Sequence, residues 1–181
     1  MNETQVLKRT ALWVDKVVIG LNLCPFAKAV RAKGQIRYVV SQADTSEGLL
    51  EDVERELLAL AAADPELVDT TILIHPRVLA DFRDSNDFVH EAEARLSELE
   101  LDGELQIASF HPNYCFADAS ADDPANCTNR SPYPMLHFLR EASITRALAS
   151  FPDPSSIYER NVQTLRGMDA AFVAALVGDD D

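Results

Sequence analysis

Hydrophobic residues recur at spacings of three and four along six stretches of the chain, the pattern of helices that bury one face. The strongest stretch, residues 46–63, places Leu49, Val53 and Leu57 about one turn apart. It begins at Ser46, a residue suited to cap a helix. The pattern predicts helices over residues 4–20, 25–32, 46–63, 85–100, 134–149 and 155–177.

Three shorter stretches have the composition of strands: residues 35–41, 70–75 and 105–110. The second is continuously apolar after its two threonines, which is typical of a strand covered on both faces. Helices separate the strands, an alternation typical of βαβ units with right-handed crossovers. The sequence therefore predicts an α/β fold with a small three-stranded, mostly parallel sheet and flanking helices.

The length and composition of the chain suit one domain. It has 181 residues, 47% of them hydrophobic and 25% charged, enough to build a substantial core. We find no internal repeat and no linker, so residues 1–177 are expected to form one globular unit. The last four residues, Gly-Asp-Asp-Asp, predict a solvated acidic tail at 178–181.

Charge and cysteine content narrow the classes of partner and compartment. Thirty acidic residues against sixteen basic ones give a net charge of −14, which disfavours nucleic acid and membranes as partners. No apolar run approaches the roughly 20 residues needed to cross a bilayer, and the first residues lack the apolar centre of a signal peptide. Three cysteines, Cys24, Cys115 and Cys127, without a Cys-x-x-Cys pair, favour the reducing cytoplasm.

The connection after the third predicted strand is unusually long. Residues 111–133 far exceed the usual connection of about 4–6 residues. Prolines stiffen this loop, and it carries His, Arg, Asn and Tyr side chains. Loops of this kind build functional sites on a rigid scaffold, so the loop indicates where chemistry takes place.

Two of the predicted strands end in the same dipeptide, His75-Pro76 and His111-Pro112. Because parallel strands share one carboxyl edge, where open α/β sheets bind ligands, both histidines are expected on one rim. Their side chains are candidates for acid and base catalysis. The alternative is structural: each His caps the sheet or bonds a loop carbonyl.

Cys24 is the third candidate for a catalytic role. It precedes Pro25, and this order predicts that the cysteine caps the helix over residues 25–32. A thiol at a helix N-terminus has a lowered pKa, which suits a nucleophile, a redox thiol or a soft metal ligand. The alternative is a small apolar residue of the core.

The loop also offers a predicted substrate-binding set. Asn126, Asn129 and Arg130 precede the helix expected over 134–149, whose first N–H groups suit an anion together with the guanidinium. Tyr114 and Tyr133 complete the set. In the alternative, Arg130 pairs with an aspartate of the same loop and only holds that loop together.

Three further residues have a predicted supporting role. His137, Arg140 and Glu141 would share one face of the helix over 134–149. A contact between the Glu and the His would orient the imidazole for acid–base work or metal ligation. The alternative is an ordinary solvated helix face.

Three motifs carry a family resemblance: residues 20–27 (Gly-Leu-Asn-Leu-Cys-Pro-Phe-Ala), 110–116 (Phe-His-Pro-x-Tyr-x-Phe) and 126–137 (Asn-x-Thr-Asn-Arg-Ser-Pro-Tyr-Pro-Met-Leu-His). With them, nearly the whole chain resembles a bacterial domain-of-unknown-function family, number 1415. The resemblance implies no particular activity. Cys24 falls inside the first motif, whereas Cys115 and Cys127 fall at variable positions of the second and third motifs.

The leading hypothesis is an enzyme that acts on a small anionic metabolite. Asn129 and Arg130 would hold the anion, while His75 and His111 would serve as acid and base. Cys24 would be a nucleophile or a thiolate ligand. One alternative makes the same Cys and His groups a transition-metal site for zinc, iron or copper. Another is a non-catalytic module that binds a ligand or a partner through the loop.

Overall fold

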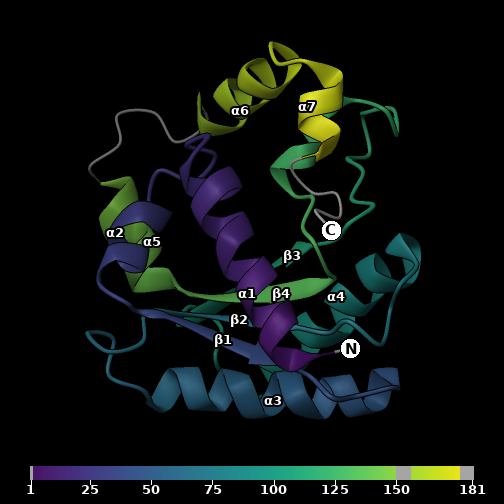
Figure 1. The fold of residues 1–181 in the computed structure, drawn as a ribbon. Helices are drawn as coiled ribbons and strands as arrows, with labels where there is room; N and C mark the ends of the chain where they lie inside the picture. The colour runs from purple at the N-terminus through teal and green to yellow at the C-terminus, as the bar shows by residue number, and fades with distance from the viewer. Residues whose placement is uncertain (1, 150–155, 176–181) are drawn as a thin grey trace.

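The structure is a computed structural model that describes residues 2–149 and 156–175. Four strands form one sheet, and helices cover both of its faces (Figure 1). In chain order the elements are α1 (Glu3–Trp13), the π-helix η1 (Val14–Ile19), α2 (Ala27–Ala32), β1 (Ile36–Val40), α3 (Ser46–Ala62), β2 (Thr70–Ile74), α4 (Phe82–Glu98), β3 (Leu105–Phe110), the 3-10 helix η2 (Pro124–Thr128), β4 (Met135–Arg140), α5 (Glu141–Leu148), α6 (Ser156–Arg166) and α7 (Ala170–Ala175).

The strand order, β1-β2-β4-β3, confirms an α/β fold and corrects its details. β1 and β2 are parallel, whereas β4 is antiparallel to both of its neighbours. The predicted sheet of three mostly parallel strands is therefore wrong, since the sheet has four strands and is mixed. β1, β2 and β3 still run in one direction, and β4 lies between the last two.

The strand that was not predicted, β4, occupies a segment expected to open the helix over 134–149. Its sequence, Met-Leu-His-Phe-Leu-Arg, is nearly all apolar because core lies against both of its faces. A continuous apolar run lacks the period of two of a half-buried strand, so periodicity does not separate it from a buried helix. The helix of this region, α5, begins only at Glu141.

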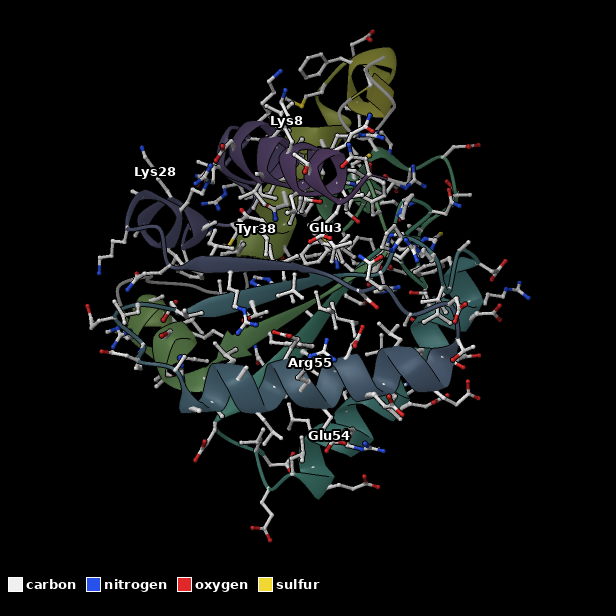
Figure 2. The ribbon with its side chains drawn as sticks, turned by 60° about the horizontal axis from the view of Figure 1, so that its bottom comes forward. Glu3, Lys8, Lys28, Tyr38, Glu54 and Arg55 are labelled. Carbon is white, nitrogen blue, oxygen red and sulfur yellow. The ribbon has the colours of Figure 1, made fainter. Side chains whose placement is uncertain are left out.

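One face of the sheet packs against α1 and η1. Ile72 of β2 and Met135 of β4 contribute to the core on this face. They belong to one cluster with Trp13 and Val17, and Tyr38 of β1 points to the same side (Figure 2). Burying an aliphatic side chain of this kind stabilises the fold by about 1.5–3 kcal/mol.

The opposite face packs against α3 and α4. Leu73 of β2 and Phe138 of β4 lie in this second core. Leu57 of α3 and Phe88 of α4 complete it from the helices, and all four side chains are at most 2% exposed. Because neighbouring residues of β2 and β4 enter different cores, these two strands hold the layers together.

Most predicted helices and strands agree with the structure to within a few residues at their ends. α3 begins at Ser46, but Thr45 is its cap, since the Thr45 hydroxyl accepts the N–H of Gly48 at 3.1 Å. α4 begins at Phe82, earlier than predicted, because the Asp81 carboxylate supplies its cap.

The C-terminal helix predicted over 155–177 is two helices, α6 and α7, within the described residues. The ends of that prediction, and the acidic tail predicted at 178–181, lie outside the described residues. Across 2–149 and 156–175, no helix combines the length and the hydropathy needed to span a membrane.

The helix predicted over 4–20 changes its hydrogen bonding where α1 gives way to η1. In the π-helix, the Gly20 N–H donates to the Asp15 carbonyl at 3.1 Å, five residues back. Such turns are rare and occur frequently at functional sites. Glycine is required at position 20, since a Cβ atom there would lie 2.1 Å from the Lys16 carbonyl oxygen.

Gly20→Ala is expected to destabilise the protein by about 1–3 kcal/mol, because its methyl group has no room beside the Lys16 carbonyl. Urea denaturation followed by circular dichroism measures the change. Gly48→Ala is the matched control: in α3 a Cβ would meet its nearest atoms at 3.4 Å, an ordinary contact, and alanine favours a helix. Wild-type stability in Gly20→Ala would show that the π-helix does not need this close approach.

Candidate functional site

A cavity of about 540 Å³ lies on the α1 face of the sheet. Residues from α2, the starts of β1 and β2, β4 and α5 line it, and Figure 1 shows α2 and α5 at the same end of the sheet. Its walls are largely apolar and include Val18, Phe26 and Ile72. This size and character are typical of sites for small molecules, which measure about 300–1,000 Å³.

All three sequence motifs reach this cavity. The first contributes Cys24 and Phe26, the second Phe110, and the third Met135 and His137. Segments far apart in the chain thus supply walls of one cavity, and two of the side chains they bring there have nucleophilic or basic atoms. This convergence makes the cavity the candidate functional site.

Cys24 lies in the loop between η1 and α2 as a free, partly exposed thiol. The expectation that it caps a helix opened by Pro25 is wrong, because α2 begins at Ala27 and the Cys24 carbonyl accepts the Ala27 N–H in a turn at 3.3 Å. The proposed helix-dipole effect on the thiol loses its basis. From α6, the buried Asn161 amide holds this loop by donating to the Leu23 carbonyl at 2.8 Å.

His137 lies on β4 with its ring at the cavity wall. Its Nε2 is 2.5 Å from the Thr70 hydroxyl oxygen, which lies 2.6 Å from the Phe138 carbonyl oxygen. Because a carbonyl only accepts, the Thr70 proton belongs to that second bond, and His137 donates through Nε2–H. The Nδ1 atom therefore keeps its lone pair.

An aromatic wall surrounds the His137 imidazole. The Phe110 ring lies beside it with centroids 6.2 Å apart, and Trp13 packs edge-on against Phe110 at 5.4 Å. Burial lowers the pKa of His137 from 6.5 to about 4. At neutral pH the ring is therefore an uncharged proton acceptor in an apolar surrounding.

The predicted helical face shared by His137, Arg140 and Glu141 is wrong, since the first two lie on β4. Side chains three positions apart on a strand point to opposite faces. The Arg140 guanidinium donates to the carbonyls of Leu60 at 2.5 Å and Ala63 at 2.8 Å, at the end of α3. It caps that helix, whereas Glu141 is the first residue of α5.

His75 and His111 lie just past the C-terminal ends of β2 and β3, as the topology predicted. Both are buried, with 1% and 2% of their surface exposed, and neither lines the cavity. His75 Nδ1 lies 3.2 Å from the Val78 carbonyl oxygen, and His111 Nε2 lies 3.2 Å from that of Leu79. Each imidazole thus forms a hydrogen bond between the end of a strand and a loop carbonyl, which is the structural role given above as the alternative to catalysis.

Residues of the predicted anion site bond to the backbone of their own loop. The Arg130 guanidinium donates to the carbonyls of Tyr114 at 3.1 Å and Ala121 at 2.7 Å. The Asn126 side chain, fully buried, donates to the Ser120 carbonyl at 2.8 Å. The helix N-terminus expected beside them is wrong, because β4 and not a helix follows the loop.

The remaining members of that set also contact protein groups. Asn129 donates to a carbonyl of β3 at 3.4 Å, and the Arg9 guanidinium lies 5.3 Å from the centre of the Tyr133 ring. Asp123, one of the aspartates of the loop that could have paired with Arg130, forms an ion pair with Arg166 instead, with 2.5 Å between nitrogen and oxygen. None of the five predicted substrate-binding residues lines the cavity.

Thr70, which orients His137, was not among the predicted site residues. A signal for it existed, since a histidine within an apolar run needs a hydrogen-bond partner once the run is buried. Within 2–149 and 156–175, no three His, Cys, Asp or Glu side chains are grouped as ligands for a metal ion. The transition-metal hypothesis stays a prediction.

The buried His75 makes stability depend on pH. Burial, reinforced by the nearby His111, lowers the pKa of His75 from 6.5 to about 4. Between those values the unfolded chain binds a proton that the folded protein does not, so acid favours unfolding. From about pH 6.5 down to pH 4, this residue is expected to remove up to about 3 kcal/mol from the free energy of unfolding.

Urea denaturation at several pH values from about 7 to 4.5 measures this effect. His75→Asn, whose amide replaces the Nδ1–H donor, is expected to flatten the pH dependence, although it lowers stability at neutral pH. The control is His90→Asn, since the His90 side chain is 77% exposed. An unchanged slope in His75→Asn would contradict the assignment.

Comparison with known proteins gives one family. A family model described as "Protein of unknown function (DUF1415)" matches residues 5–175, nearly the whole chain. Neither the curated proteins nor the solved structures compared with the chain gave a match. Since the family model covers far more than half of the sequence, the chain belongs to the DUF1415 family.

Proposed function

We propose that the protein is an enzyme that acts on a small molecule with an apolar body, held in the cavity. Cys24 is the nucleophile, and His137 accepts its proton. The observation that supports this is that Cys24, a free thiol, and His137, whose Nε2 lies against the Thr70 hydroxyl, line the same cavity. The cysteine–histidine chemistry expected from the sequence is kept, with His137 in place of the two rim histidines.

Thr70 is the positioning residue in this proposal. Enzymes with an activated nucleophile commonly use a third group to fix the tautomer and direction of the base. The Thr70 hydroxyl accepts the Nε2–H of His137 and donates to the Phe138 carbonyl. The ring therefore cannot flip or change its tautomer without losing this chain of bonds, and Nδ1 is held as an acceptor.

The low pKa of His137 determines how the base works. A pKa of about 4 keeps the imidazole unprotonated at neutral pH but makes it a weak base. When the thiol proton moves to Nδ1, the thiolate charge stabilises the imidazolium beside it. In this proposal, proton transfer accompanies attack of sulfur on the acyl carbon of an ester or thioester. The new C–S bond forms as the bond from that carbon to the leaving oxygen or sulfur breaks, and the leaving group takes the proton from Nδ1.

Apolar contact recognises the body of the substrate, because several polar side chains at the cavity are already bonded within the protein. The Gln35 amide donates to the Pro65 carbonyl at 3.1 Å. The Asp69 carboxylate accepts the Ser143 hydroxyl at 2.5 Å. Each square ångström of apolar surface removed from water contributes about 25 cal/mol to binding, before the entropic cost of association.

The apolar lining also favours a second function, non-catalytic binding of a small molecule. Such a function needs the cavity but not the thiol.

The three free cysteines, Cys24 among them, fit the reducing cytoplasm expected from the sequence, where a nucleophilic thiol stays active.

Alkylation by iodoacetamide, followed at each cysteine by mass spectrometry, tests the base without knowledge of the substrate. His137→Gln is expected to slow alkylation of Cys24 at neutral pH by about tenfold or more, since it removes the proton acceptor. Thr70→Val should act in the same direction. Cys115, partly exposed and outside the cavity, is the internal control whose rate stays constant.

The same alkylation rate for Cys24 in wild type and His137→Gln, with Cys115 as reference, would sink the catalytic assignment. Turnover of a panel of apolar esters and thioesters then separates the two functions. An enzyme loses turnover in Cys24→Ala while it still binds an apolar dye. A binding protein binds the dye in both forms and turns over no member of the panel.

A further inference from the structure

We infer that the ligand of the cavity is an amphipathic carboxylate, with an apolar chain inside and its negative group at the mouth between Lys33 and Arg146. This inference rests on the proposed function of the cavity and names the class of its substrate: the carboxylate is a recognition group, and the acyl carbon that Cys24 attacks is a separate group of the same molecule. The apolar walls and the distribution of charged side chains around the opening carry it.

The charged side chains that line the cavity have a net positive charge, opposite in sign to that of the whole molecule. Lys33 and Arg146 are exposed and line the cavity, so they lie at its mouth, and Glu66 is exposed there with the opposite sign. Arg140 and Asp69 also line the cavity, and they keep their charges although Arg140 donates to the end of α3 and Asp69 accepts the Ser143 hydroxyl, which also accepts from Arg146. Three basic residues against two acidic ones give the lining a small positive balance on a chain of net charge −14.

The charges close to the mouth, and not the net charge of the protein, determine which charged group of a ligand is favoured there. At physiological ionic strength, interactions between exposed charges are screened over about 8 Å, so the distant acidic residues contribute little at the mouth. A carboxylate there lies within reach of a cation from each side, one following α2 and one in the last turn of α5. Neither Lys33 nor Arg146 forms an ion pair with another side chain in the described part of the protein.

The interior explains why the rest of the ligand is an apolar chain. The aliphatic side chains of Val14 and Ile36 line the cavity, and the aromatic residues Trp13 and Phe110 continue this largely apolar wall. A charged group placed there would lose its hydration without gaining a partner. An amphipathic molecule therefore enters in one orientation, with its chain inward past Cys24 and its carboxylate in water at the mouth.

Displacement of a neutral fluorescent dye, N-phenyl-1-naphthylamine, tests this class. Decanoate, decanol and decyltrimethylammonium share one chain length and differ in the charge of the head group. Decanoate is expected to displace the dye with a Kd about tenfold below that of decyltrimethylammonium, from two exposed charge contacts. The preference should weaken at high salt.

Charge-reversal variants locate the effect. Lys33→Glu combined with Arg146→Glu should abolish or invert the preference for decanoate while dye binding persists. Lys28→Glu is the matched control, because this exposed residue of α2 points away from the sheet and does not line the cavity (Figure 2). Equal displacement by all three compounds, or an equal effect of Lys28→Glu and Lys33→Glu, would overturn the inference.

This outcome is distinguishable from failure of the proposed function. Should His137→Gln slow Cys24 alkylation while the three head groups bind equally, the enzyme proposal stands and the carboxylate inference fails. Should decanoate be preferred while the alkylation rates are equal, the carboxylate site stands and the catalytic proposal fails.

Discussion

Backbone hydrogen bonding by β4 is the constraint on which the rest of the structure depends. β4 pairs with β2 on one side and with β3 on the other, so the inner edges of both strands find partners only through it. Without it, a row of buried N–H and C=O groups would remain unpaired, each at a cost of about 1–3 kcal/mol. Its register also builds the site, because His137 lies opposite Ile72 of β2, and Thr70 is two residues along that strand.

The polar side chains at the two ends of this sheet have different uses. At the carboxyl end of β2 and β3, His75, His111 and Arg130 bond to loop carbonyls, and turning toward a ligand would leave those carbonyls unpaired. Cys24 and His137 both line the largely apolar cavity. A side chain that bonds to a backbone carbonyl cannot turn to a ligand without breaking that bond, whereas a side-chain atom without a protein partner can take part in chemistry. The structural residues and the residues proposed to be catalytic therefore differ in whether their polar atoms already have hydrogen-bond partners in the protein.

How much the sequence predicts depends on whether the deciding interaction is local. The range of α3 and the strand over 105–110 follow from spacing and composition within a few turns, and both were predicted almost residue by residue. β4 was not, because pairing with two distant strands made an apolar run extended. The rim position of His75 and His111 followed from topology, but their burial did not. The loop whose Val78 and Leu79 carbonyls these imidazoles bond includes a left-handed Leu79 with a φ of 59°, a conformation that a leucine rarely adopts.

In the proposed mechanism, burial of His137 has two opposite effects: it weakens the imidazole as a base, and it strengthens the attraction between the imidazolium and a thiolate. Lowering its pKa from 6.5 to about 4 makes protonation harder by about 3 kcal/mol. A thiolate about 4 Å from the imidazolium would return about 4 kcal/mol in a partly dry site, but only about 1 kcal/mol in bulk water. In the proposed mechanism, the ion pair is therefore more stable once water has left the cavity. A substrate with an apolar body displaces that water, and its binding would strengthen an activation of Cys24 that the empty cavity already supplies in part.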